Sequence, residues 1–148
     1  MYDQILVATD GSDGSTKAIT EALGLADLSD ATLHALYVVD TRDYSTLPES
    51  KWLTIEDQLT EQGERAVGAV EHLGTEGGVE TVTAITRGIP HEEILAYVDQ
   101  HAIDLIVIGT HGRTGLNHFL IGSVAEKVIR SADIPVHVVR INTEIDQA

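Results

Sequence analysis

Short apolar runs alternate with longer amphipathic segments along almost the whole chain, and this alternation limits the possible folds more than any other feature of the sequence. The runs with the length and composition of buried strands are residues 5–8, 31–39, 80–86, 104–108 and 135–139. A strand followed by a helix and another strand needs a crossover connection, and such right-handed connections build parallel sheets. We therefore expect an α/β domain: an open parallel five-stranded sheet in the order 3-2-1-4-5, with four helices on both faces.

Apolar residues at helical spacing define the expected helices between these strands. The first helix has a narrow apolar face of Ala18, Ile19, Ala22, Leu23 and Ala26, and the second, within residues 51–73, has Leu59, Ala66, Val67, Val70 and Leu73. The third begins at Pro90, a favoured first helical residue, with a face of Ile94, Leu95 and Val98, and the fourth, residues 123–131, has Val124, Ala125, Val128 and Ile129. Residues 10–15 have the composition of a turn with helix-capping side chains.

The length and composition indicate one domain. A chain of 148 residues is close to the usual size of a single domain, and a hydrophobic content of 43% is enough for a buried core. We place this domain at residues 1–141 and a C-terminal tail at 142–148. The chain has no cysteine, so neither disulfides nor thiolate chemistry contributes. Because the start of the chain lacks a signal-peptide pattern and no apolar run has membrane-spanning length, we expect a cytoplasmic protein without membrane contact.

The charge balance is strongly acidic. The 24 Asp and Glu residues outnumber the 9 Lys and Arg residues, and the formal net charge is -15. Such a surface repels the phosphates of nucleic acids, so we expect no nucleic-acid partner. Excess carboxylates suit a salt-rich cytoplasm that screens their repulsion, which predicts a halophilic origin, with an ordinary acidic protein as the alternative.

A glycine-rich segment lies between the fourth strand and the fourth helix. Gly109, Gly112 and Gly122 let the backbone turn sharply and approach an anion without a Cβ atom in the way. Ser123 begins the following helix, whose first amides have no intrahelical acceptor and attract phosphate. The segment therefore predicts a phosphate site, and with it a nucleotide.

The expected strand order places a second feature beside this segment. Open parallel sheets bind ligands at the carboxyl ends of their strands, where the strand order reverses. In the order 3-2-1-4-5 this point lies between the first and fourth strands. The first strand ends at Thr9 and Asp10 and the fourth at Gly109, so both features converge on one crevice.

The element order and the glycine pattern resemble the universal stress protein family over essentially the whole chain. The ATP-binding motif of that family is G-x-x-G, nine residues, then G-[ST]. Here Gly109 and Gly112 are followed by nine residues, 113–121, and then by Gly122 and Ser123, so the pattern is complete. The resemblance implies a fold like that of the adenine nucleotide alpha hydrolases.

The resemblance also implies a set of ligand contacts at the matching positions. It implies phosphate contacts from Gly112, Gly122, Ser123, Val124 and Ala125, a position near the ribose for Gly109, and backbone recognition of adenine near Val39. It places Asp10, next to Thr9, against the ribose or a phosphate-bound metal ion. Finally, it implies a homodimer formed through the last strand, from Pro135 to Val139.

Three residues near the crevice have alternative roles. Asp10 is either a ligand or only a turn former, because Asp-Gly-Ser is ordinary turn chemistry. A carboxylate beside a triphosphate is repelled unless it binds a ribose hydroxyl or a cation, so a functional Asp10 predicts dependence on Mg²⁺ or Mn²⁺. Arg113 either binds phosphate or solvates the loop. For His111 we favour a contact within the loop over a role as an acid or base.

Other classes of α/β protein fit less well. A receiver domain needs clustered acidic residues and a lysine at its strand ends, and the predicted strand ends lack them. A flavodoxin needs a phosphate-binding loop after the first strand, and residues 10–15 are only loosely suitable for one. The pyrophosphatase loop of related adenylating enzymes usually begins with serine, where this chain has Asp10. The remaining histidines are scattered without a convincing zinc-ligand spacing.

The sequence favours binding over turnover. The Walker pattern G-x-x-x-x-G-K-[ST] is absent, the nearest lysine to the glycines is Lys127 in the following helix, and no residue stands out as a base for activating water. We expect a nucleotide-dependent stress-response or signalling protein that binds ATP with a divalent cation and hydrolyses it slowly or not at all. The alternative is a nucleotide-free dimeric interaction protein that pairs through its last strand.

Overall fold

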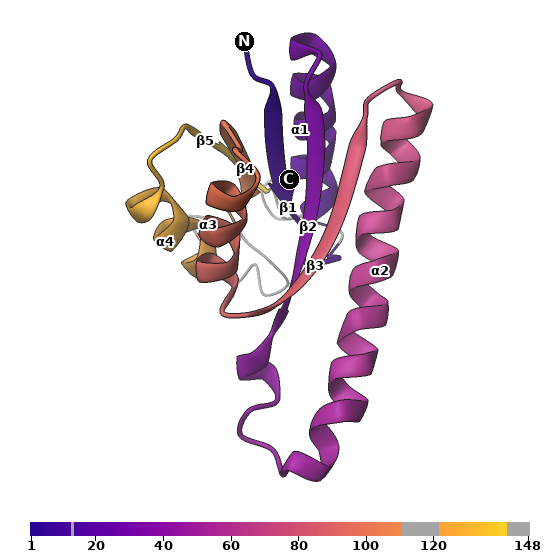
Figure 1. Ribbon diagram of the computed structural model, residues 1–148, viewed down its shortest axis with the longest axis vertical. Helices are drawn as coiled ribbons and strands as arrows, with labels where there is room; N and C mark the ends of the chain where they lie inside the picture. The colour runs from indigo at the N-terminus through magenta and orange to yellow at the C-terminus, as the bar shows by residue number, and fades with distance from the viewer. Residues whose placement is uncertain (13, 111–121, 142–148) are drawn as a thin grey trace, which may run out of the picture.

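The computed structural model describes residues 1–12, 14–110 and 122–141. Its elements are β1 (Gln4–Ala8), α1 (Ser15–Ser29), β2 (Thr32–Asp40), α2 (Trp52–Glu76), β3 (Thr81–Gly88), α3 (Pro90–Gln100), β4 (Leu105–Gly109), α4 (Ser123–Ser131) and β5 (Val136–Val139), with 3-10 helices at Thr41–Asp43 and Glu49–Lys51 (Figure 1). This element order confirms the predicted one, and no predicted boundary is shifted by more than three residues. The tail at 142–148 and the residues His111, Gly112 and Arg113 lie outside the described residues.

The strands form one parallel sheet in the order β3-β2-β1-β4-β5, as the sequence predicts. The strands do not end level with one another. Pairing of β1 with β2 ends at Ala8 and Leu36, whereas β2 continues beside β3 until Asp40 and Gly88. Residues 37–40 of β2 therefore extend past the end of the central strand β1.

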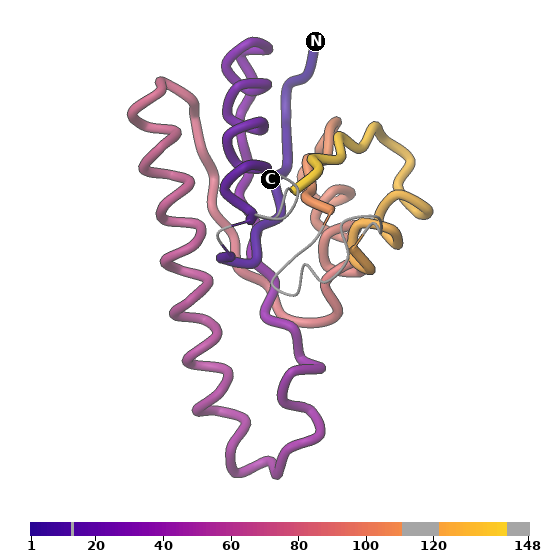
Figure 2. The backbone as a smooth tube through the Cα atoms, turned by 180° about the vertical axis from the view of Figure 1, so that it is seen from behind, coloured from indigo at the N-terminus to yellow at the C-terminus, as the bar shows by residue number. Residues whose placement is uncertain are grey.

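Helices cover the sheet in two layers, with α1 and α2 on one face and α3 and α4 on the other (Figures 1 and 2). The strands alternate accordingly, because successive side chains of a strand point to opposite faces. Ile5 and Val7 of β1 pack with the α1 and α2 layer, and Leu6 between them packs with the α3 and α4 layer. Both faces of the sheet are thus buried, as the continuous apolar runs of its strands require.

Two apolar residues of the predicted helical faces are exposed, which corrects those predictions. Leu73 is 42% and Ile129 is 39% exposed. The buried residues of α2 are Gly63, Val67, Val70 and Gly74. Gly74, and not its neighbour Leu73, faces the sheet, and a Cβ atom there would collide with the hydroxyl of Thr81. In both cases the residue next to the exposed one, Gly74 or Val128, holds the inward position.

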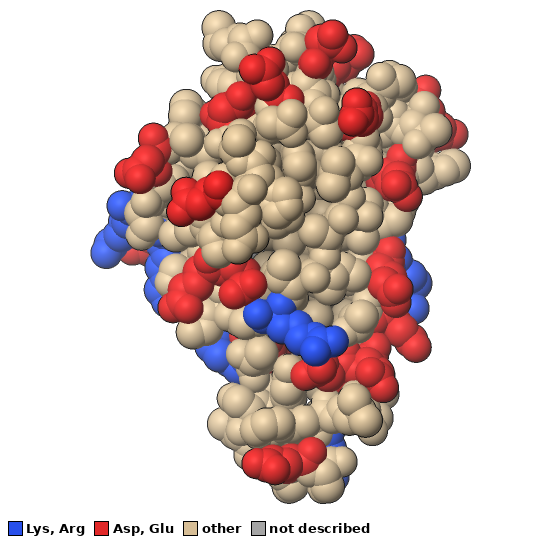
Figure 3. Space-filling view, in the orientation of Figure 1, with Lys and Arg blue, Asp and Glu red and all other residues tan. Residues whose placement is uncertain are grey.

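Carboxylates are distributed over the surface and clearly exceed the basic groups on the face shown in Figure 3. Within the described residues, no helix is long and apolar enough to cross a membrane.

A buried histidine joins α3 to the sheet at the end opposite the predicted crevice. His34 is 5% exposed. Its Nδ1 atom lies 2.7 Å from the hydroxyl of Tyr97, and its Nε2 atom lies 2.6 Å from Oε1 of Gln4. His101 stacks on Tyr97, with ring centroids 3.8 Å apart. Because Gln4 Oε1 can only accept, Nε2 carries the hydrogen and Nδ1 accepts from Tyr97, as in a neutral imidazole.

Acid is expected to destabilise the protein through His34. Burial, and then the nearby His101, lower the pKa of His34 below its ordinary 6.5, while Glu80 acts in the opposite direction. The unfolded chain therefore binds this proton more readily, and stability that is fully present above pH 6.5 is lost as the pH falls from 6.5 through the lower pKa of the folded state. We expect urea unfolding to show a larger loss between pH 7.5 and 5.5 for the wild type than for His34→Gln. Equal losses would contradict the prediction.

Candidate functional site

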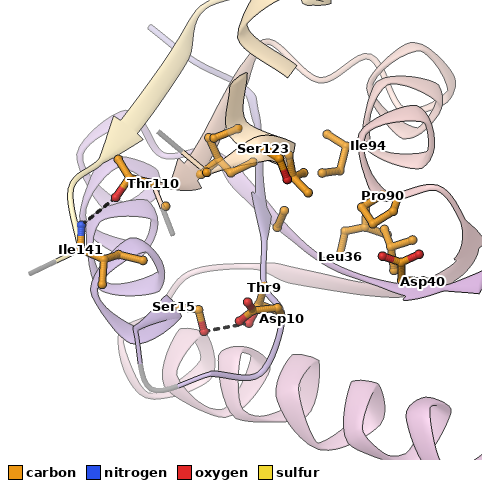
Figure 4. A pocket seen from close by; sticks show the side chains of 17 residues that line it. Thr9, Asp10, Ser15, Leu36, Asp40, Pro90, Ile94, Thr110, Ser123 and Ile141 are labelled. Carbon is orange, nitrogen blue, oxygen red and sulfur yellow. Dashed lines mark hydrogen bonds between the residues drawn. The ribbon is translucent and has the colours of Figure 1, made fainter. Parts of the chain in front are cut away.

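A cavity of about 290 Å³ opens at the carboxyl ends of the strands. Its walls come from the ends of β1, β2 and β4 and from the N-terminal ends of α1, α3 and α4 (Figure 4). This is the position predicted from the strand order, since β1 and β4 are the strands on either side of the order reversal.

Most of the predicted site residues that the structure describes line this cavity. They are Thr9, Asp10, Gly109, Gly122, Ser123, Val124 and Ala125. Val39 does not line it: its side chain is fully buried among the residues packed against α1 and α2. Its neighbours Val38 and Asp40 line the cavity instead. The positions of His111, Gly112 and Arg113 lie outside the described residues.

Asp10 forms a turn at the edge of the cavity. Its Oδ1 atom accepts a hydrogen bond of 2.9 Å from the backbone N–H of Ser12. Among the described residues, this amide is the sole hydrogen-bond partner of the carboxylate. Asp10 is therefore a turn former, as one of its two expected roles requires, and it also contributes a carboxylate to the cavity wall.

Two hydroxyls fix the backbone on either side of this turn. Thr9 Oγ1 lies 3.1 Å from Ser15 Oγ and accepts the N–H of Gly11 at 3.2 Å. Ser15 donates its hydroxyl hydrogen to the carbonyl of Ser12 at 2.7 Å, so Thr9 is the donor in the pair. α1 begins after Gly14, which has no side chain to cap it, and Asp13, within the segment predicted to supply capping side chains, lies outside the described residues. The hydroxyls stabilise the turn.

The overhanging end of β2 presents backbone groups to the cavity. The carbonyl of Leu36 accepts the N–H of Thr9 at 3.0 Å, whereas the N–H of Leu33 donates to Glu80 on the opposite side. Even-numbered residues of β2 thus turn their backbone groups toward β1, because these directions alternate along a strand. Val38 follows this rule, but the pairing with β1 has already ended at Leu36. Its N–H and C=O therefore face the cavity side of the sheet.

The N-terminus of α4 supplies further backbone donors. Gly122 is the N-cap residue and makes no side-chain cap bond. The first amide to donate within the helix is that of Glu126, which bonds the carbonyl of Gly122 at 2.9 Å. The preceding amides, at residues 123–125, have no intrahelical acceptor, and all three residues line the cavity. This end of α4 attracts a negative charge.

Sequence reasoning missed Thr110, Asp40 and Ile141 as cavity residues. Ile141 packs over the end of β4, where a Cβ atom on Gly109 would lie 2.6 Å from Ile141 Cδ1. Gly109 therefore makes room for the segment after β5, as well as lining the cavity. No local pattern of the sequence could show this, because Ile141 is 31 positions along the chain from its hydrogen-bond partner Thr110.

Two carboxylates line the cavity, Asp10 and Asp40. Arg42 pairs with Asp40 through Nη2 at 2.8 Å and through Nε at 2.9 Å, and this hydrogen bonding raises the pKa of Arg42 above its ordinary value. The described residues contain no group of three or more His, Cys, Asp or Glu side chains that could hold a metal ion. A divalent cation here would need oxygen ligands from a bound phosphate as well.

Comparison with known proteins agrees with the fold. The model of the universal stress protein family matches residues 1–140. The chain belongs to the universal stress protein family. Universal stress protein MJ0531 of Methanocaldococcus jannaschii is 42% identical to it over 141 residues, which cover 95% of this chain and 83% of that protein.

Solved structures of universal stress proteins share the fold of this one. The structure of protein MJ0577, also from M. jannaschii, is 31% identical, with a TM-score of 0.87 and coverage of 97% of this chain and 99% of that chain. Two more distant proteins show the fold alone. One universal stress protein is 22% identical, with a TM-score of 0.74 and coverage of 95% and 99%, and one from Arabidopsis thaliana is 18% identical, with a TM-score of 0.71 and coverage of 97% and 94%.

Proposed function

We propose that this universal stress protein binds ATP in the cavity and acts as a nucleotide-dependent stress-response or signalling protein. The observation that carries the proposal is the N-terminus of α4, because residues 123–125 line the cavity and their amides have no intrahelical acceptor. Backbone amides at a helix N-terminus bind phosphate through both their hydrogen bonds and the helix dipole. The hydroxyl of Ser123 adds a further donor.

The other walls suit the nucleoside. The N–H and C=O of Val38 form a donor and acceptor pair that matches N1 and the exocyclic amine of adenine, while guanine offers the opposite pattern. Leu36, Pro90 and Ile94 supply apolar contacts beside this pair. Where it holds no metal ion, Asp10 would accept a hydrogen bond from a ribose hydroxyl.

Two of the structures with this fold contain adenine nucleotides. One is a universal stress protein in complex with cAMP, and the Arabidopsis protein has AMP bound. At these low sequence identities the similarity shows only a shared fold. The proposal for this chain therefore depends on its own cavity.

We further propose that Mg²⁺ or Mn²⁺ accompanies ATP by bridging its phosphates and Asp10. Magnesium commonly binds one or two carboxylates together with substrate phosphates, which fits the single carboxylate that Asp10 offers. Hydrolysis is proposed to be slow or absent, because no lysine is among the described residues of the cavity wall.

Asp10→Asn tests this role. Asparagine retains an oxygen acceptor for the Ser12 amide, so the turn is preserved, but the charge is lost. We expect the affinity for ATP in the presence of Mg²⁺ to fall by about tenfold, and the difference between titrations with and without Mg²⁺ to disappear. Isothermal titration calorimetry provides both readouts. Asp99→Asn, on the exposed side of α3, makes the same change in charge and should leave binding unchanged. Wild-type behaviour of Asp10→Asn would contradict the role.

The dimer belongs to the same proposal. β5 is an edge strand of the sheet, and its Val138 is 37% exposed. An unpaired edge with apolar side chains favours pairing with another copy. We propose that the strand from Pro135 to Val139 forms this contact.

Nucleotide binding is tested on protein purified in high salt. Mass spectrometry identifies any nucleotide released on denaturation, and the emptied protein is then titrated with ATP and GTP, each with and without Mg²⁺. ATP binding that exceeds GTP binding is expected from the Val38 backbone pair. A folded dimer that binds no nucleotide would refute the proposal and favour the nucleotide-free interaction protein.

A further inference from the structure

Thr110 connects three parts of the chain at the wall of the cavity. It follows β4 directly and is 7% exposed. Its N–H donates to the carbonyl of Val139 at 3.0 Å, its Oγ1 atom accepts the N–H of Ile141 at 3.2 Å, and its carbonyl accepts the N–H of Gly122. Thr110 thus hydrogen-bonds both the end of β5 and the N-cap residue of α4. Figure 4 shows its hydrogen bond to Ile141.

We propose that Thr110 is a positioning residue that couples the phosphate-binding end of α4 to the edge strand β5. The proposal rests on the proposed nucleotide function, because the coupling matters through the amides that would bind phosphate. Neither the glycine motif nor the charge pattern of the sequence assigns a role to this residue.

The hydrogen bonds define how the coupling works. The place of Gly122 sets the direction of the amides at residues 123–125, since Gly122 is the N-cap and its carbonyl accepts the first intrahelical bond. The backbone carbonyl of Thr110 accepts the hydrogen bond from the Gly122 amide. Its own amide holds Val139 at the end of β5, and its hydroxyl holds Ile141 in the segment after β5. A displacement of Val139 or Ile141 would therefore move Thr110, and with it the carbonyl group that holds the amide of Gly122.

Ile141 strengthens this link through packing. Its side chain lines the cavity and occupies the space above Gly109. The hydroxyl of Thr110 fixes the backbone of Ile141, so the same hydrogen bond places an apolar part of the cavity wall. By linkage, if an ordered end of β5 favours phosphate binding at α4, a bound phosphate stabilises the end of β5 by the same coupling free energy.

The test compares Thr110→Val, which keeps the branched shape but loses the hydroxyl, with Thr110→Ser, which keeps the hydroxyl. Calorimetry should show that Thr110→Val binds ATP about tenfold more weakly, with adenosine binding changed by less than about twofold, because adenosine lacks the phosphates. Thr110→Ser should restore ATP affinity. Thr60→Val, which removes a hydroxyl from α2 on the opposite face of the sheet, is the control and should bind both ligands like the wild type.

Amide hydrogen exchange, followed by NMR, tests the coupling without relying on nucleotide affinity. In the absence of nucleotide, Thr110→Val should accelerate exchange at both Ile141 and Gly122. With ATP, exchange at Ile141 should slow in the wild type and in Thr110→Ser but not in Thr110→Val.

Three outcomes would overturn the coupling: unchanged exchange at Gly122 in Thr110→Val, an equal loss of ATP and adenosine affinity, or failure of Thr110→Ser to restore it. A wild type that binds no ATP would refute the proposed function, whereas joint acceleration at Ile141 and Gly122 would still support the coupling.

Discussion

Gly122→Val is expected to lower the affinity for ATP by at least about a hundredfold, equivalent to about 2.7 kcal/mol. Gly122 lines the cavity directly before the amides of α4, so a branched side chain would take up space that a phosphate group needs. Its φ of -59° and ψ of 151° are accessible to valine. The substitution should therefore block the ligand without straining the backbone.

Calorimetric titration of ATP, together with a thermal unfolding curve, separates these two effects. Ser131→Val, at the other end of α4 and exposed to solvent, is the matched control and should retain the affinity of the wild type. If Gly122→Val bound ATP as tightly as the wild type and remained folded, the phosphate groups could not lie against this end of α4.

Two glycines of α2 are expected to respond to alanine with opposite changes in stability. A Cβ atom on Gly63 would lie 2.5 Å from Cδ1 of Tyr37, a ring that is 3% exposed and cannot move aside easily. Gly63→Ala should therefore lower the free energy of unfolding by about 1–3 kcal/mol. A Cβ atom on Gly68 has no neighbour within 4 Å, so Gly68→Ala should raise it by roughly 0.5–1 kcal/mol through reduced backbone entropy of the unfolded chain.

Urea unfolding of both variants under the same conditions provides the measurement. Each variant is the control for the other, because the chemical change and the helix are the same. A loss of stability in both variants, or a gain in both, would contradict the explanation from local packing.

The sheet order and most of the cavity could be predicted because they depend on short-range patterns. Apolar runs between helical segments define the crossovers, and the crossovers place the ends of β1 and β4 together. Gly122 and Ser123 could be placed at the cavity because the start of the helix after the fourth strand is readable from the sequence, and the first amides of any helix lack intrahelical acceptors.

Other parts of the site depend on register, which no local pattern contains. The prediction placed backbone recognition near Val39, but the hydrogen-bonding pattern of β2 turns Val38 toward the cavity and Val39 toward β3. Thr110 and Ile141 meet only because β5 pairs with β4. Leu73 appeared to face the core because it is apolar, whereas the close approach of α2 to the sheet needs the smaller Gly74.

The overhang of β2 beyond β1 also bears on how this protein tolerates mutation. The donor and acceptor that Val38 presents belong to the main chain, so a side-chain replacement at this position changes the bulk near the cavity without deleting either group, proline excepted. An insertion or deletion within β2 would instead shift the alternation by one residue and turn both groups toward β3. The base recognition proposed for this position should therefore tolerate amino-acid substitutions but be sensitive to changes in strand length.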